Sequence, residues 1–341
     1  MNARTGTTRT GTVLRVPPIS PELHAATGER YDALDLPGDP GDPGVADDPA
    51  RAAFLAEHGG DVVAIVCSNL SPVPASLIEA LPRLGVIANH GVGYDNVDVD
   101  VALARGIAVS HTPDVLDDAV AETALALLLA ARRRIVTADL FVRDGAWSKG
   151  AFPLTDQVSG SRVGILGLGR IGRAVARRLE AFGCAISYHN RRPVPGVDYA
   201  YAASPAELAA GVDNLIVIVP GGPGTEGLVD AAVLDALGPR GLLVNVARGS
   251  VVDEDALVAA LQEGRLGGAA LDVFAREPEV PAALLVRDDV VLAPHVGSAT
   301  HETRAAMRRL TLDNLDDWLA TGTLRTPIPE MSASPGEGGE R

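Results

Sequence analysis

Cysteine is scarce in this chain, which has only Cys67 and Cys184 among its 341 residues. Two cysteines so far apart imply neither a disulfide framework nor a cysteine-based metal site. The histidine, aspartate and glutamate residues show no metal-ligand spacing either, so the sequence predicts no metal. A chain without a disulfide framework fits a reduced, cytoplasmic setting.

Long hydrophobic runs are also missing. The longest strongly apolar run, TALALLLAA at residues 123–131, is too short to cross a bilayer and is flanked by Glu122 and Arg132. The opening segment, MNARTGTTRTGTVLRV, lacks the apolar core that a signal peptide needs. We therefore expect neither a membrane span nor a secretory signal.

Positive charge is in deficit, since 29 lysines and arginines face 44 aspartates and glutamates and the formal net charge is −15. Nucleic acids and anionic membranes bind basic surfaces, so this balance disfavours both as partners. A local basic pocket is still compatible with it. Hydrophobic residues, by contrast, make up 47% of the chain, enough to form sizeable cores. The length suits two domains better than one.

The first third of the chain alternates short apolar segments with helix-like ones. Expected strands are residues 12–16, 62–67, 85–89 and 106–110, and a helix is expected at residues 74–84. This pattern predicts a small α/β domain that ends near Pro113.

A long helix is expected at residues 116–134, and its apolar breadth suggests burial between domains or subunits. Beyond it the chain alternates cleanly between strands and helices. The expected strands are residues 162–167, 185–189, 214–219, 242–247, 268–273 and 290–293. Apolar strands with helical crossovers indicate a parallel sheet covered on both faces. A last helix, at residues 300–319, is expected to return to the first domain.

A glycine-rich turn, GLGRIG, follows the strand RVGIL and precedes the amphipathic segment RAVARRLEAFG. In this context Gly167 makes the tight turn, Gly169 lets the backbone approach a pyrophosphate, and Gly172 lets the helix pack on the strand. The positive end of the helix dipole then faces the phosphates. The alternative is a strand–helix turn without a ligand. The context favours a dinucleotide site.

The segment SYHNRRP stands where the second strand of such a domain ends, 15 residues after the last glycine of the loop. NAD-specific proteins usually carry a carboxylate there, to hold the ribose 2′-hydroxyl. This chain has Asn190, Arg191 and Arg192 instead. Guanidinium groups donate paired hydrogen bonds to a phosphate, so the sequence predicts NADPH, with weaker use of NADH. Two solvated arginines in an NAD enzyme are the alternative.

Three polar residues stand at strand ends in the same half of the chain: Arg248, Glu277 and His295. In open α/β sheets the ligand lies beyond the carboxyl ends of the strands, where these residues would meet. Arg248 can pair with a substrate carboxylate and polarise a carbonyl. His295 can protonate the carbonyl oxygen as a hydride arrives, and Glu277 can orient His295 and favour its protonated form. The three suit reduction of a 2-oxo acid.

Long segments of the chain resemble the D-isomer-specific 2-hydroxyacid dehydrogenase family, from about residue 60 to 328. They include GVGYDNVDVDVALARGIAVSHTPDV, GILGLGRIGRAVARRLEAFG, NVARGSVVDEDALVAALQEGRLGGAALDVFAREP and VVLAPHVGSAT. The segments RDGAWSKGAFPLT and YHNRRP are most similar to the NADPH-dependent glyoxylate/hydroxypyruvate and hydroxyphenylpyruvate reductases of that family.

The resemblance implies further site residues. The backbone at Val92 and Gly93 would bind the substrate carboxylate, together with Arg248 and His295. Asp272 would contact the nicotinamide amide. Further cofactor contacts would come from Arg170, Ile171, Val219, Pro220, Val246, Ala247 and Gly297. Gly221 and Gly222 depart from the family pattern, which often has Leu and Thr there. The family also implies a homodimer, in which Trp147 can reach the partner's active site.

We therefore expect an α/β protein of two Rossmann-like or flavodoxin-like parallel-sheet domains with a cleft between them. Residues 1–112 with 296–330 would form the substrate domain, residues 113–295 the dinucleotide-binding domain, and residues 331–341 a disordered tail. The expected activity is NADPH-dependent reduction of glyoxylate or hydroxypyruvate to the D-2-hydroxy acid. Alternatives are reduction of hydroxyphenylpyruvate or another 2-oxo acid, 3-phosphoglycerate, formate or phosphite dehydrogenation, and a dinucleotide-sensing protein like the C-terminal-binding-protein corepressors.

Overall fold

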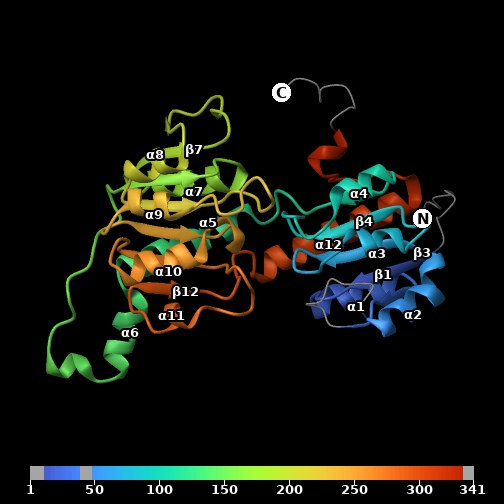
Figure 1. Cartoon of the computed structure of the whole chain (residues 1–341), viewed down its shortest axis with the longest axis horizontal. Helices are drawn as coiled ribbons and strands as arrows, with labels where there is room; N and C mark the ends of the chain where they lie inside the picture. The colour runs from blue at the N-terminus through green and yellow to red at the C-terminus, as the bar shows by residue number, and fades with distance from the viewer. Residues whose placement is uncertain (1–10, 39–47, 333–341) are drawn as a thin grey trace. The chain divides into compact units, whose positions relative to one another are not determined.

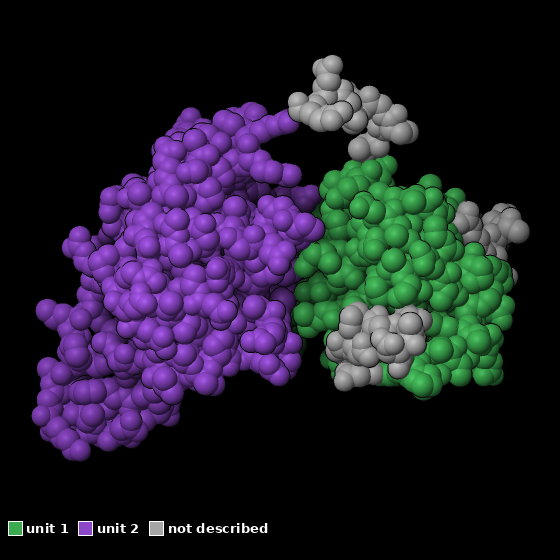
Figure 2. Space-filling model, in the orientation of Figure 1, with its two compact units in different colours: residues 1–115, 301–341 green, residues 116–300 purple. Residues whose placement is uncertain are grey.

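The computed structural model describes residues 11–38 and 48–332. The chain divides into two compact units, residues 1–115 with 301–341 and residues 116–300 (Figure 2). The predicted disordered tail, residues 331–341, falls almost wholly outside the described residues. Met331 and Ser332, however, belong to a short 3-10 helix. Within the described ranges, no helix combines the length and the apolar character needed to cross a bilayer.

The first unit is built on a five-stranded parallel sheet with the order β2-β1-β3-β4-β5, a flavodoxin-like arrangement (Figure 1). Its strands are β1 Thr12–Val16, β2 Ala33–Asp35, β3 Val62–Ser68, β4 Val86–His90 and β5 Ala108–Ser110. Every residue of β3 is buried, because helices cover both faces. Ile65 packs in the core on one face, and Val66 packs on the other with Trp318.

The helices of the first unit begin at caps that the sequence supplies, such as Ser20 and Asp98, whose side chains accept backbone N–H groups. They are α1 Pro21–Arg30, α2 Pro49–His58, η1 Gly59–Asp61, α3 Ala75–Glu79, α4 Val99–Ala104, α12 His301–Thr321 and η4 Pro329–Ser332. The helix expected at residues 74–84 is shorter than predicted, because Pro82 cannot continue it.

The second unit is built on a seven-stranded parallel sheet with the order β12-β11-β10-β9-β6-β7-β8. Its strands are β6 Arg162–Leu166, β7 Ala185–His189, β8 Ala200–Tyr201, β9 Asn214–Val217, β10 Leu242–Asn245, β11 Gly268–Leu271 and β12 Val290–Leu292. Strand β6 pairs with both β7 and β9, so the strand order reverses at β6. This reversal is the switch point beside which nucleotides bind in Rossmann folds.

The helices of the second unit are α5 Asp117–Arg132, α6 Ile135–Arg143, η2 Ala146–Lys149, α7 Arg170–Glu180, α8 Pro205–Ala210, α9 Ala231–Leu237, η3 Gly249–Val251, α10 Glu254–Gln262 and α11 Ala282–Leu285. Helix α5 contacts α7, β10 and β11 of its own unit. That packing accounts for its apolar breadth. Helix α6, in contrast, has no buried residue.

Candidate active site

The glycine loop between β6 and α7 is shaped by two close backbone contacts. Gly167 has φ +108°, and a Cβ on it would lie 2.8 Å from the carbonyl oxygen of Ile218. A Cβ on Gly172 would lie 2.2 Å from the carbonyl oxygen of Gly167. A Cβ on Gly169 would meet nothing within 4 Å. The protein's own packing therefore requires the outer two glycines, whereas the middle one faces open space that a ligand can use.

The N-terminus of α7 has no side-chain cap, since Gly169 occupies the cap position. The first backbone N–H groups of a helix lack intrahelical partners, and the helix dipole adds partial positive charge. The end of α7 therefore suits an anion such as a pyrophosphate. Arg170 and Ile171, which the resemblance implies as cofactor contacts, belong to this first turn.

The end of β7 is tied to the glycine loop. The N–H of Gly167 donates to the carbonyl of His189 (3.0 Å), and the N–H of Leu168 donates to Oδ1 of Asn190 (2.6 Å). This bond leaves the Asn190 amide nitrogen as the group that can donate to a ligand. Arg191 and Arg192 are exposed, and neither forms an ion pair or hydrogen bond with any residue in the described ranges.

His295 and Glu277 form a direct pair. Nδ1 of His295 lies 2.7 Å from Oε2 of Glu277, and their side chains are 24% and 23% exposed. The N–H of Phe274 donates to the other oxygen of Glu277 (3.0 Å). Burial acts to raise the pKa of Glu277, but the hydrogen bond and charge of His295, with help from Phe274 and Arg248, lower it overall. Because Nδ1 is engaged, Nε2 is the nitrogen left for a substrate.

The turn that carries His295 is held by Asp272, at the end of β11. His295 has φ +52°, in the left-handed region that non-glycine residues rarely adopt. Its N–H donates to the carbonyl of Asp272 (2.8 Å). The two carboxylate oxygens of Asp272 accept the N–H groups of Val296 (2.7 Å) and Gly297 (2.8 Å). Burial raises the pKa of Asp272, although these N–H groups oppose the shift.

The sequence did not reveal this supporting role of Asp272. Its only signal was an aspartate directly after an apolar strand, where a buried carboxylate needs hydrogen-bond donors.

Arg248 follows β10, next to β11 in the sheet. The carbonyl of Arg248 accepts a hydrogen bond from the Asn245 amide (3.0 Å), which fixes the turn. A Cβ on Gly249 would lie 1.9 Å from the carbonyl carbon of Phe274, so the turn touches the loop that carries Glu277. The positive charge of Arg248 is among the causes that lower the pKa of Glu277. Arg248, Glu277 and His295 thus gather at the carboxyl ends of β10, β11 and β12.

The remaining predicted cofactor residues of this unit follow other strand ends. Val246 and Ala247 are buried directly after β10. Val219 is half-buried and Pro220 exposed after β9.

The other predicted substrate contact, the loop Gly91–Gly93, belongs to the first unit and follows β4. Its carbonyls are turned toward buried side chains. Asn89 donates to the carbonyls of Gly91 (3.3 Å) and Gly93 (2.9 Å), and Nδ1 of His111 lies 3.1 Å from the carbonyl of Val92. The N–H groups of Val92 and Gly93 donate to no other residue that the structure describes. They are free to bind an anion.

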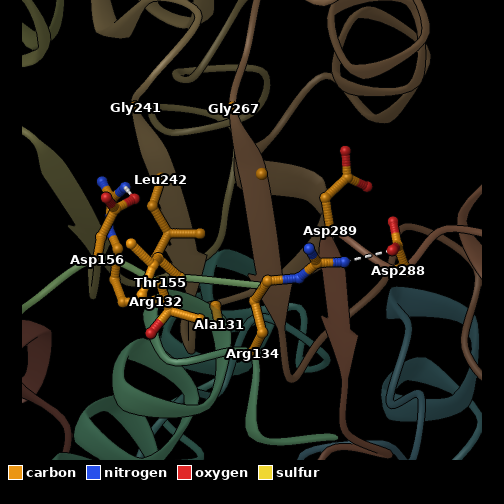
Figure 3. A pocket seen from close by; sticks show the side chains of 12 residues that line it. Ala131, Arg132, Arg134, Thr155, Asp156, Gly241, Leu242, Gly267, Asp288 and Asp289 are labelled. Carbon is orange, nitrogen blue, oxygen red and sulfur yellow. Dashed lines mark hydrogen bonds and ion pairs between the residues drawn. The ribbon is translucent and has the colours of Figure 1, made fainter. Parts of the chain in front are cut away.

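A cavity of about 330 Å³ lies at the opposite ends of the strands in the second unit (Figure 3). Gly241 and Gly267, which precede β10 and β11, line it together with Arg132, Arg134 and Asp156. Arg134 pairs with Asp288 there. Because His295 follows the carboxyl end of β12, this cavity is separate from the candidate site. Within the described residues, no group of three or more His, Cys, Asp or Glu could hold a metal.

Comparisons with known proteins agree with this geometry. Residues 125–297 match the family model described as D-isomer specific 2-hydroxyacid dehydrogenase, NAD binding domain. The chain is 49% identical over 280 residues to a hydroxyphenylpyruvate reductase of Plectranthus scutellarioides, which covers 82% of this chain and 90% of the relative. It is 45% identical over 280 residues to a glyoxylate/hydroxypyruvate reductase of Arabidopsis thaliana, with the same coverage.

Among solved structures, the NADPH-dependent glyoxylate/hydroxypyruvate reductase of Sinorhizobium meliloti, in complex with NADP and malonate, superposes with a TM-score of 0.86. The sequence identity is 46%, and the match covers 94% of this chain and 97% of that chain. The predicted fold class and the resemblance are thereby confirmed. The chain belongs to the D-isomer-specific 2-hydroxyacid dehydrogenases, a family of nicotinamide-dependent oxidoreductases.

Proposed function

We propose that this protein reduces a small 2-oxo acid, glyoxylate or hydroxypyruvate, to the D-2-hydroxy acid with NADPH. The observation that carries the proposal is the 2.7 Å contact between His295 and Glu277, on the same sheet as the glycine loop. An acid–base pair on a dinucleotide-binding sheet is what reduction of a carbonyl requires, since a proton must accompany the hydride.

The cofactor proposed for the second unit is NADPH, which supplies the hydride when bound. The uncapped N-terminus of α7 and the open space at Gly169 fit its pyrophosphate. Arg191 and Arg192 are exposed and unpaired within the described ranges, so they fit a 2′-phosphate, and the Asn190 amide nitrogen can donate to the ribose. The proposed cofactor set is completed by residues that follow other strands: Val219, Pro220, Val246, Ala247, Asp272 and Gly297.

The proposed chemistry divides between three side chains. Arg248 binds the substrate carboxylate and polarises the carbonyl with its positive charge. His295 donates the proton on Nε2 to the carbonyl oxygen, because its Nδ1 is held by Glu277. Glu277 keeps the imidazole oriented and stabilises its positive charge. The N–H groups of Val92 and Gly93, in the first unit, contribute hydrogen bonds to the carboxylate.

An aromatic 2-oxo acid such as hydroxyphenylpyruvate is the second candidate substrate. The relative from Plectranthus scutellarioides, at 49% identity, is a hydroxyphenylpyruvate reductase. The same acid–base pair serves both substrates, because the reacting carbonyl and carboxylate are common to them. The difference lies in the space available to the rest of the acid.

We also infer a homodimer in the cytoplasm. The segment 135–157, named the arm here, exposes Ile135, Leu140, Trp147 and Leu154, which are 52–100% accessible. A second copy of the chain would cover these apolar side chains. The cytoplasmic setting rests on the scarcity of cysteine.

Initial reduction rates in a crossed panel test the function directly. NADPH and NADH are each combined with glyoxylate, hydroxypyruvate, pyruvate and 4-hydroxyphenylpyruvate, and nicotinamide absorbance is followed. We expect fast turnover of glyoxylate and hydroxypyruvate with NADPH. A preference for 4-hydroxyphenylpyruvate would move the substrate to the second candidate. Absence of turnover with every pair, despite tight dinucleotide binding, would refute the reductase assignment.

A further inference from the structure

In the first unit, α12 runs antiparallel to β4 (Figure 1). Near the start of β4, a Cβ on Gly85 would lie 2.4 Å from the indole ring of Trp318. At the end of β4, Nδ1 of His90 lies 3.1 Å from Oγ1 of Thr311. Moving from Trp318 back to Thr311 therefore means moving along β4 toward its carboxyl end. The turns of α12 that precede Thr311 must extend past that end.

Two arginines occupy those preceding turns. Arg308 and Arg304 are three and seven residues before Thr311, a spacing that places all three on one side of a helix. At about 1.5 Å of rise per residue, Arg304 stands roughly 10 Å beyond Thr311. The chain that leaves the end of β4 is the loop Gly91–Gly93. Arg304 and this loop, whose N–H groups are free, therefore both lie beyond the carboxyl end of β4.

The electrostatics of His90 agree with this placement. Burial lowers the pKa of His90 to about 4, and the charges of Arg304 and Arg308 add to the effect. Both arginines are therefore close enough to the end of β4 to act on it.

Arg304 is half-buried and has no anionic partner among the described residues. Burial lowers the pKa of Arg304, and no nearby carboxylate opposes the shift. It forms no ion pair or hydrogen bond with a residue in the described ranges, whereas Arg325, near the end of this unit, pairs with Asp313 and Asp317. The positive charge of Arg308 is among the causes that lower the pKa of Glu22. A half-buried guanidinium without an anion is costly to maintain, which points to a ligand.

We propose that Arg304 is a further substrate-binding residue, which binds the carboxylate of the 2-oxo acid together with the N–H groups of Val92 and Gly93. This inference rests on the proposed function for the identity of the acid. The loop contributes hydrogen bonds without a net charge, and Arg304 contributes the positive charge that a carboxylate prefers. Arg304 contributes to binding, whereas proton transfer stays with His295.

The test compares Arg304→Gln and Arg304→Lys with Arg309→Gln, a matched control at an exposed position of α12. Oxalate, a small dicarboxylate without a reducible carbonyl, serves as the probe, and its binding to the full-length protein with NADPH is measured by calorimetry. We expect Arg304→Gln to weaken oxalate binding by roughly tenfold or more, because a charge-assisted hydrogen bond is lost. The KM for glyoxylate should rise by a similar factor while kcat changes little.

The other variants complete the test. Arg304→Lys should fall between wild type and Arg304→Gln, because it keeps the charge but not the paired donors. Arg309→Gln should match wild type, and the Kd for NADPH should be the same in all four proteins. Unchanged oxalate affinity and unchanged KM in Arg304→Gln would overturn the proposal. If the wild type reduces no 2-oxo acid yet binds oxalate through Arg304, the proposed function fails and the anion site stands.

Discussion

At the scale of single residues, His295 carries the most direct prediction. Replacing His295 with Gln removes the proton donor but keeps a side chain that can hydrogen-bond to Glu277. We expect kcat for glyoxylate to fall by roughly 100-fold, the usual contribution of general acid catalysis. Steady-state kinetics measure the loss, and fluorescence titration with NADPH serves as the control, since cofactor affinity should be kept. Turnover close to that of the wild type would exclude His295 as the acid.

Glu277 adds a prediction about pH and stability. Its pKa is lowered in the folded protein, so the stabilisation it brings is present above the ordinary glutamate value of 4.5 and is lost as the pH falls through the lowered value. Glu277→Gln should therefore lower Tm at neutral pH, and the difference from wild type should shrink as the pH falls below about 4.5. Thermal denaturation at a series of pH values measures this. A Tm difference that is the same at every pH would contradict it.

The candidate site was predictable from sequence only in part. Arg248, Glu277 and His295 were found because each follows an apolar strand, and the ends of parallel strands meet at one edge of a sheet. Asp272 was assigned to the nicotinamide by resemblance, and its hydrogen bonds to the turn of His295 were not predicted. Arg304 was missed because the sequence does not show that a helical arginine is half-buried without a partner.

At the scale of elements, the glycines of the loop between β6 and α7 have different roles: Gly172 serves packing and Gly169 serves ligand binding. Gly172→Ala places a methyl group against the carbonyl of Gly167, and we expect a loss of about 1–3 kcal/mol in the free energy of unfolding. Gly169→Ala has open space and an ordinary negative φ, so stability should be kept while the Kd for NADPH rises, because the methyl group occupies the space of the pyrophosphate. Denaturant unfolding and NADPH titration give the two quantities. Equal effects of both variants on both quantities would contradict this division.

The elements themselves were predicted well where the apolar pattern was long. Strands at residues 12–16 and 185–189 have the bounds that the sequence indicated. Strands β2 and β8 were missed, because three and two residues are too few to show an alternation. Several predicted strands end early: β9 stops at Val217 and not at residue 219. The apolar residues that follow line the carboxyl edge of the sheet, so hydrophobicity alone does not mark where pairing stops.

At the scale of the whole molecule, a net charge of −15 opposes the binding of anions. The proposed cofactor and substrate are both anionic. The protein therefore has to concentrate positive groups locally, and the described residues supply Arg191, Arg192, Arg248, Arg304 and the N-terminus of α7. This distribution explains why the overall charge, which disfavours nucleic acid partners, did not reveal the ligands.

The arm raises the last prediction, which concerns assembly. It begins after α5, within the second unit, and Arg132 holds the start and the end of the arm together. Nε of Arg132 donates to the Asn214 side chain (2.6 Å), and the Arg132 carbonyl accepts the N–H of Asp156 (3.3 Å). The rings of Phe141 and Phe152, 5.3 Å apart, join its outgoing and returning halves. An arm fixed in this way while its apolar side chains face solvent is shaped for a partner.

We expect the wild type to behave as a dimer of the 35.1 kDa chain in size-exclusion chromatography with light scattering. Leu140→Asp should shift it toward the monomer, because a buried carboxylate at the interface is costly. Val286→Asp is the matched control, since Val286 is 86% exposed but lies outside the arm. If both variants keep the mass of the wild type, the arm is not the dimer contact. If the wild type is monomeric at micromolar concentration, the apolar arm serves another purpose and the homodimer proposal fails.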